Sequence, residues 1–268
     1  MNIAHVHNQF LPGQWLDTFI PGIPKAGGFT ITSPPSAAIA TPNKTKTNSQ
    51  NEPAPHIELA VQKSPNPPAQ YFHLPIPTLL NTPLSVRVGG SFTYPPPPQS
   101  LPIPASHIKR LVLVAGGVGI NPLISIFSHL IRLHASQRPE EIHFLYGTKT
   151  GESEPDPQSI LFLPRLMDLV GAVNEARDVT LSLFLTGPTG YESGEKIEHG
   201  KLPNRTWAKR IGEGDMVGAL DGWREDRAGR DTTVCYVCGP QNMTDEVVEF
   251  LGKQEGMKPG RVLCEKWW

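Results

Sequence analysis

Two short motifs carry residues whose types and spacing suit the binding of a phosphate-containing cofactor. The first follows an apolar run at residues 111–115, where Gly117 and Gly119 precede a segment with helical spacing of apolar residues. Glycines here allow a tight turn and a close approach of the backbone to a pyrophosphate, which the amides and positive end of the following helix stabilise. Pro122 stands where the dinucleotide-binding fingerprint has its third glycine. The motif predicts a dinucleotide site, with a merely tight turn as the alternative, formed by Gly116, Gly117, Val118, Gly119, Ile120, Asn121 and Pro122.

The second motif centres on a cysteine at the end of another apolar run. Cys238 is followed at once by Gly239 and Pro240, which force a turn, and Met243 comes three residues later. Cys235 and Cys238 form a possible metal or redox pair, but residues three apart on a strand face opposite sides, and the sequence has no second pair of ligands. We therefore expect no metal site, and we interpret Cys235 and Cys264 as buried structural thiols.

The elements that must position these motifs alternate between strand and helix from residue 108 onward. Such alternation predicts a parallel sheet, whose carboxyl edge gathers ligand-binding loops. Asn121 is expected to cap the first helix, with Pro122 in its first turn. We predict strands at residues 110–115, 141–146, 179–186 and 233–238, and helices at 122–136, 159–170, 206–211 and 244–251.

The first hundred residues have a different pattern, with short apolar stretches separated by proline and glycine clusters. They predict a small β-domain with strands at residues 14–20, 29–32, 57–63 and 84–88. Residues 34–56 are poor in bulky apolar side chains, and we interpret them as a disordered insertion. The proline-rich residues 95–104 predict an interdomain linker. The expected domains are therefore residues 1–106 and 107–268.

These motifs together resemble the ferredoxin-NADP reductase superfamily. The glycine turn at 117–122 is similar to its nicotinamide-binding motif, and Cys238-Gly239-Pro240-Gln241-Asn242-Met243 is similar to its Cys-Gly-Pro-x-x-Met signature. Residues 12–15, Pro-Gly-Gln-Trp, resemble the entry to a strand of its flavin-binding barrel. The resemblance implies a small flavin-binding β-barrel followed by a Rossmann-like parallel-sheet domain that binds NAD(P). The fold class is thus all-β plus α/β.

The resemblance also implies a reaction and a set of roles. A flavin-dependent NAD(P)H oxidoreductase transfers hydride from the nicotinamide to FAD and passes electrons onward, for which an electron-acceptor protein is a possible partner. NADH is the weakly favoured donor, and NADPH is not excluded, because no acidic or basic residue marks the ribose site near Thr148. Cys238 would border the nicotinamide and Glu265 could relay a proton, and further cofactor contacts would come from Phe29, Thr30, Thr148, Gly239, Pro240, Met243 and either Trp267 or Trp268.

Two departures from the superfamily pattern concern the flavin. The expected Arg-x-Tyr-Ser/Thr is here Gly27-Gly28-Phe29-Thr30, so the arginine that pairs with a flavin phosphate is missing. Two strands that usually precede the Pro-Gly-Gln strand also have no counterpart in the eleven residues before Pro12, so we expect an incomplete barrel. A second function therefore stays open: an NAD(H)-binding pseudoenzyme or sensor without functional flavin. A dehydrogenase that acts without flavin lacks a convincing catalytic His–Asp or Tyr–Lys arrangement.

Composition and charge exclude several other classes of function. A formal net charge of −1 gives no basic field for nucleic acid. The longest apolar run, residues 111–120, is shorter than the roughly 18–20 residues of a transmembrane helix. Three cysteines and the lack of a visible signal peptide indicate an intracellular, reducing compartment. The resemblance alone implies a mitochondrial location, and the cytoplasm is the alternative.

Overall fold

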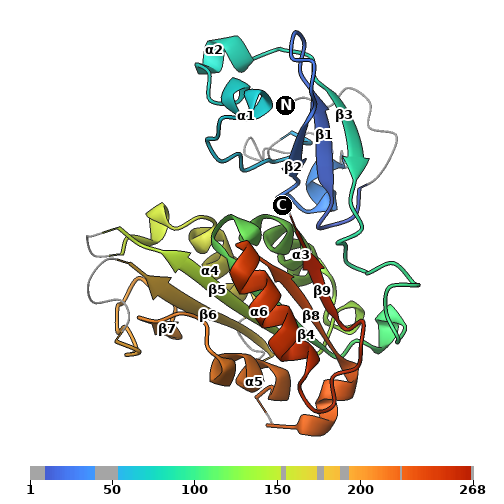
Figure 1. The fold of residues 1–268 in the computed structure, drawn as a ribbon, viewed down its shortest axis with the longest axis vertical. Coiled ribbons are helices and arrows are strands. Elements are labelled where there is room, and N and C mark those ends of the chain that lie inside the picture. Colours follow the sequence, from blue (N-terminus) through green and yellow to red (C-terminus); the bar gives the residue numbers. More distant parts are fainter. Residues whose placement is uncertain are drawn as a thin grey trace, which may run out of the picture.

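The computed structural model describes residues 10–39, 54–151, 155–173, 178–187, 193–223 and 225–266. These residues form a three-stranded antiparallel sheet and a six-stranded parallel sheet (Figure 1). The predicted fold class, a small all-β part followed by a Rossmann-like α/β part, is therefore confirmed.

The parallel sheet has the strand order β7-β6-β5-β4-β8-β9. Two of its interior strands, β4 and β8, are buried along their whole length, which explains why each reads as a continuous apolar run. The strands are β4 (Arg110–Gly116), β5 (Glu141–Lys149), β6 (Val179–Thr186), β7 (Thr206–Trp207), β8 (Thr233–Cys238) and β9 (Val262–Glu265).

Helices cover both faces of this sheet (Figure 1). α3 (Ile120–Arg132) and α4 (Leu163–Gly171) pack on one face, where Phe127 and Leu166 belong to the larger core cluster. α5 (Glu213–Asp221) and α6 (Gln241–Gly252) pack on the other. Short 3₁₀ segments connect the elements: η2 (Ala105–His107), η3 (Gly117–Gly119), η4 (Ala135–Gln137), η5 (Pro157–Ser159) and η6 (Arg227–Thr232).

Three predictions about this region are wrong. The helix predicted at 206–211 is instead the short strand β7, because Trp207 stacks on Phe184 of β6 with ring centroids 5.3 Å apart. Helix α5 begins later, at Glu213, and neither it nor β9 was expected. Asn121 does not cap α3: the helix begins at Ile120, two residues before the predicted start, and Gly119 occupies the N-cap position.

The antiparallel sheet is small and has the order β2-β1-β3. It consists of β1 (Trp15–Phe19), β2 (Gly27–Thr30) and β3 (Ser85–Gly89). Residues 57–63 are not a strand, apart from an isolated bridge between Ile31 and Leu59. Two short helices that the sequence did not predict, α1 (Pro67–Tyr71) and α2 (Ile76–Leu79), precede β3. The buried core of this part comprises Phe10, Leu16, Ile31 and Ile57.

The predicted insertion at 34–56 needs a correction at both ends. Residues 40–53 lie outside the described residues, but η1 (Pro35–Ala38) is a 3₁₀ helix. The amide of His56 donates a hydrogen bond to the carbonyl of Ala37 at 2.9 Å, so the two described ends are held side by side. These ends are therefore ordered, contrary to the expectation.

The two sheets are joined by hydrogen bonds and by a shared core. The hydroxyl of Tyr236 on β8 donates to the carbonyl of Thr93 at 2.7 Å. Nη2 of Arg165 on α4 donates to both carboxylate oxygens of Glu58, at 2.7 Å each. Phe92 and Tyr94 already belong to the core cluster of the parallel sheet. The domain division at 106/107, which falls within η2, stays a prediction.

Within the described residues, no helix is long and apolar enough to cross a membrane.

Candidate functional site

Both motifs meet at the carboxyl edge of the parallel sheet. Ala115 of β4 is paired with Cys238 of β8, and Cys238 is paired in turn with Glu265 of β9. The glycine turn, the Cys-Gly-Pro turn and the carboxylate therefore leave the sheet side by side. Parallel strands bring their carboxyl ends to one edge, which is where open α/β sheets bind ligands.

The glycine turn and the Cys-Gly-Pro turn lie in direct contact. A Cβ atom added at Gly119 would overlap the carbonyl of Cys238 and come within 2.6 Å of the amide nitrogen of Gly239. One added at Gly116 would overlap the sulfur of Met243 and lie 2.8 Å from Pro240. Gly119 is thus required by backbone packing between the two motifs, and Gly116 packs on the side chains of Met243 and Pro240. The sequence predicted that Gly119 makes room for a pyrophosphate. The structure instead shows Gly119 in contact with the Cys-Gly-Pro turn.

Gly117 is the glycine whose surroundings suit a bound phosphate. Its φ of +52° lies in the left-handed region, and an added Cβ would meet no atom within 4 Å. Its neighbour Val118 is 47% exposed although it is apolar. The turn also leads directly into α3, a 13-residue helix whose N-terminal end favours an anion. Open space, a left-handed backbone that favours glycine and a helix end therefore coincide at one point.

The other predicted residues of this motif have structural contacts. Ile120 and Pro122 are buried against the sheet. The side-chain amide of Asn121 donates to the carbonyl of Ala60 at 3.2 Å, which ties the start of α3 to the antiparallel part. Ser125, one turn later, donates to the carbonyl of Ser33 at 2.9 Å. This role could not be predicted, because a serine in a helix has no distinguishing sequence pattern.

The two cysteines of β8 lie on opposite faces of the sheet, as their spacing predicts. Cys238 is fully buried in the core cluster beneath α3 and α4, and Cys235 lies in the cluster beneath α5 and α6. Burial raises the pKa of the Cys235 thiol to about 12, so that thiol stays protonated and unreactive near neutral pH. Among the described residues, no group of histidine, cysteine and acidic side chains could hold a metal ion.

Glu265 is the acidic group of this edge. It is half-buried at the end of β9, and burial raises the pKa of its carboxyl above the usual range. A carboxyl with a raised pKa can hold and release a proton closer to neutral pH than an exposed glutamate can. Trp267 and Trp268, which were expected to supply an aromatic ring here, lie outside the described residues.

Thr148 lies at the same edge, near the end of β5. Its carbonyl accepts a hydrogen bond from the hydroxyl of Thr186 on β6 at 3.3 Å. Thr148 thus sits between the two strand ends that would face the adenosine half of a dinucleotide.

The predicted flavin residues Phe29 and Thr30 lie on β2. Gly27, on the same strand, is the position at which the superfamily arginine is missing. A Cβ atom at Gly27 would come within 2.5 Å of Pro68 and 2.6 Å of the Phe29 ring, so a side chain there would force these neighbours to shift. Phe29 is partly buried and packs edge-to-face on Phe72 at 5.2 Å, while Thr30 is buried. Gly28, by contrast, is exposed and open.

The Pro-Gly-Gln turn contacts α3 directly. Gly13 has a φ of +96°, and its amide donates to the hydroxyl of Ser125 at 3.4 Å. Trp15 lies against Gly89 and Gly90, where an added Cβ would come within 2.9 Å of its ring. The adjacent glycines in the sequence are the signal that could have predicted this close contact.

The chain has a fold of the ferredoxin-NADP reductase type. No family model matches the sequence. The chain is 34% identical over 270 residues to a human protein, covering 99% of this chain and 73% of that protein. It is 33% identical over 273 residues to a Danio rerio protein, covering 100% of this chain and 85% of that protein. Both relatives are named oxidoreductase NAD-binding domain-containing protein 1, and the chain belongs to this family.

Solved structures show the same fold. The CS-b5R domains of human Ncb5or in the NAD⁺ form are 15% identical, with a TM-score of 0.59, and the match covers 97% of this chain and 62% of that one. A mutant ferredoxin-NADP⁺ reductase from Plasmodium falciparum with 2′P-AMP is 16% identical, with a TM-score of 0.57 and coverage of 96% and 83%. The family and the fold support an oxidoreductase of the NAD(P)H-dependent type.

Proposed function

We propose that this chain is an NAD(P)H oxidoreductase that binds a nicotinamide dinucleotide across the carboxyl edge of β4 and β8. The observation that carries the proposal is the contact between the two turns, in which Gly116 and Gly119 pack on Cys238, Gly239 and Met243. This contact leaves Gly117 as the open position at the start of α3. The pyrophosphate would lie there, stabilised by backbone amides and by the helix end.

Other residues at this edge would contact the adenosine ribose and the nicotinamide of the dinucleotide. Thr148 would lie near the adenosine ribose, and the Gly239–Pro240 backbone would border the nicotinamide, with Cys238 buried directly beneath it. Because neither an acid nor a clear 2′-phosphate ligand marks the ribose position, we favour NADH and retain NADPH as a possible donor. Glu265, with its raised pKa, would hold a proton at its carboxyl oxygen beside the nicotinamide position.

We propose further that FAD binds against the antiparallel sheet. When bound, the flavin would accept a hydride from the nicotinamide and allow electrons to pass onward to an acceptor protein. Phe29 and Thr30 would contact this cofactor from β2, and the exposed backbone at Gly28 offers an approach to it. The closed space at Gly27 means that a phosphate of FAD must be bound without an arginine at that position.

A second function is favoured by the same closed position. If no other group replaces the arginine, the chain would bind NAD(H) as a sensor or pseudoenzyme and hold flavin weakly or not at all. The packing of Pro68 and Phe29 over Gly27 favours this alternative, because it removes the position of the cation as well as the cation itself.

An absorption spectrum of the purified protein tests the proposal and separates the two functions. Spectra would be recorded as purified, after addition of FAD and removal of the unbound excess, and after anaerobic addition of NADH or NADPH. Flavin bands that stay with the protein and bleach with a pyridine nucleotide support the flavoenzyme. NADH binding by calorimetry without retained flavin supports the sensor, and the absence of both would refute the proposed function.

A further inference from the structure

A cavity lies on the face of the parallel sheet, away from the carboxyl edge. It has a volume of about 590 Å³ and is enclosed by β5, β6 and α5. Its floor includes His143 and Thr180, which belong to the first halves of their strands, whereas the proposed dinucleotide site uses the strand ends. A volume of this size falls within the usual range for small-molecule sites.

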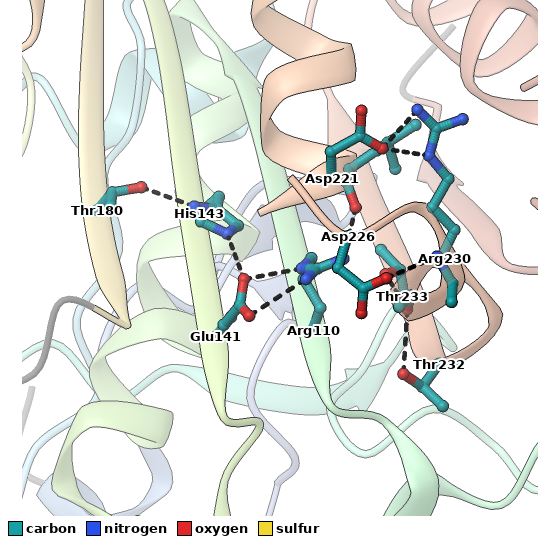
Figure 2. Close-up of polar contacts among 12 residues, drawn as sticks. Arg110, Glu141, His143, Thr180, Asp221, Asp226, Arg230, Thr232 and Thr233 are labelled. Atoms are coloured by element: carbon teal, nitrogen blue, oxygen red, sulfur yellow. Dashed lines mark hydrogen bonds and ion pairs between the residues drawn. The ribbon is translucent and has the colours of Figure 1, made fainter. Parts of the chain in front are cut away.

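The floor of the cavity is held rigid by a chain of buried polar groups. Figure 2 shows Arg110, Glu141, His143 and Thr180 in a row across three strands. Arg110 binds the Glu141 carboxylate through two nitrogens at 2.9 and 3.1 Å, and the same carboxylate lies 3.3 Å from Nε2 of His143. Nδ1 of His143 lies 2.8 Å from the Thr180 hydroxyl. These groups satisfy one another and form a preorganised surface.

Ser182 is the polar group on this floor that remains without a partner. It is 6% exposed and lies next to Thr180 on the same face of β6. Its hydroxyl makes no hydrogen bond to any other part of the chain that the structure describes. The Ser182 hydroxyl lines the cavity, where it can donate a hydrogen bond to, or accept one from, a polar group that enters.

The charged groups around the cavity leave an excess of positive charge at its mouth. The carboxylates of Asp215 and Asp221 are each neutralised, by Lys209 at 2.7 Å and by Arg230 at 2.5 Å. Arg205 and Arg227 also line the cavity, and neither has an ion-pair partner within the described ranges; Glu225 is the one further acid of the lining. Two guanidinium groups at a cavity mouth suit a phosphate or a carboxylate.

Aromatic and glycine residues shape the remaining walls. Trp207 and the exposed Trp223 both line the cavity, and the Arg205 guanidinium lies 5.9 Å from the Trp207 ring centroid. On α5, Gly214 and Gly218 face the same space, and a Cβ added at either would meet no atom within 4 Å. Glycine is a poor helix former, and neither packing nor a positive φ requires it here. The two glycines keep the space open.

We propose that this cavity binds a nucleoside monophosphate. Its ring would lie against the tryptophan wall, its sugar hydroxyls would reach Ser182 and Glu225, and its phosphate would lie between Arg205 and Arg227. The site is separate from the proposed dinucleotide edge and does not depend on it.

Calorimetric titration with adenosine 5′-monophosphate, with adenosine as the uncharged comparison, tests this site. Saturable binding of the monophosphate, at least about tenfold tighter than that of adenosine, is expected, because a guanidinium–phosphate contact is charge-assisted. No binding of the monophosphate up to about 10 mM would overturn the proposal. Equal binding of both compounds would also overturn it, because the arginines would then have no role.

Two variants test whether the monophosphate binds in the cavity or at the carboxyl edge of the sheet. Gly218→Leu fills the cavity from a helical position with open space, so the protein should fold at least as well while binding falls at least about tenfold. Arg205→Gln should weaken the monophosphate about tenfold and leave adenosine unchanged. Gly171→Leu, at the end of α4 and equally open, is the matched control. Monophosphate binding that survives Gly218→Leu would show that the ligand binds elsewhere and would refute the cavity site.

Discussion

The two sheets of this chain differ in how completely each supports its expected cofactor. The parallel sheet is covered by helices on both faces, and its two signature turns touch each other at Gly116 and Gly119, where an added Cβ would overlap neighbouring atoms. The antiparallel sheet has three strands in the described residues and a core of four buried residues. At its predicted flavin position a glycine is covered by Pro68 and Phe29. The comparison indicates that the dinucleotide half keeps its binding geometry while the flavin half departs from the superfamily pattern.

The largest effect is expected from Gly119→Val in the dinucleotide half. The added side chain would collide with backbone atoms of Cys238 and Gly239, which cannot move aside as a flexible side chain would. We expect a loss of about 3 kcal/mol or more in the free energy of unfolding, together with loss of NADH binding. Urea unfolding and calorimetry measure the two quantities. Gly200→Val, at a position with open space, is the control, and equal stability of the two variants would disprove the contact between the turns.

Low pH should lower the free energy of unfolding of the parallel-sheet part through protonation of Glu141. Burial alone would raise the pKa of this carboxyl, but hydrogen bonds from His143 and Arg110 and the charge of Arg110 outweigh it and lower the pKa to about 2. Because the folded pKa lies below the ordinary value of 4.5, the stabilisation is present above pH 4.5 and is lost as the pH falls through 2. It amounts to about 3 kcal/mol.

Unfolding of wild type and Glu141→Gln across this pH range isolates the effect. The difference in stability between them should shrink as the pH falls from 4.5 toward 2. Asp17→Asn, which breaks the Asp17–Arg87 pair of the antiparallel sheet, is the comparison, because Arg87 is largely exposed and such pairs contribute little. A pH-independent difference for Glu141→Gln would contradict the assigned role of the buried pair.

A smaller effect should distinguish two neighbouring glycines in the flavin half. Gly27→Arg is expected to cost about 2 kcal/mol, because Pro68 and the Phe29 ring occupy the space, and it should not improve FAD binding. Gly28→Arg has open space, so stability should stay within about 0.5 kcal/mol and the new cation should strengthen FAD binding. Improved FAD retention by Gly27→Arg would show that the position is not closed and that the two halves differ less than proposed.

Much of the parallel sheet could be predicted from local pattern. β6 and β8 have the predicted bounds: β8 is buried on both faces and reads as a nearly continuous apolar run, and β6 alternates apolar with small polar residues in its first half. β7 could not be predicted, since two residues carry no periodicity and its place depends on the stacking of Trp207 on Phe184. α1 and α2 are likewise short and rich in proline.

The candidate site, like the fold, was predictable from the sequence only in part. The residue types and spacing indicated where the two turns lie, because strand ends share one edge. The reason for Gly119 could not be predicted, since the backbone it contacts is more than a hundred residues away in the sequence. The closed space at Gly27 depends on Pro68, which local pattern does not place beside β2. Contacts between distant segments thus explain what sequence reasoning missed.

The most direct test of the central claim is NADH binding to Gly117→Asp and Gly117→Asn. Both residues tolerate the left-handed backbone better than other side chains, both fit the open space, and they differ chiefly in charge. If a pyrophosphate lies at Gly117, calorimetry should show binding by wild type and by the Asn variant, with the Asp variant weakened at least about tenfold further by charge repulsion. Equal affinities of the Asp and Asn variants, or no NADH binding by wild type, would contradict the proposed dinucleotide site.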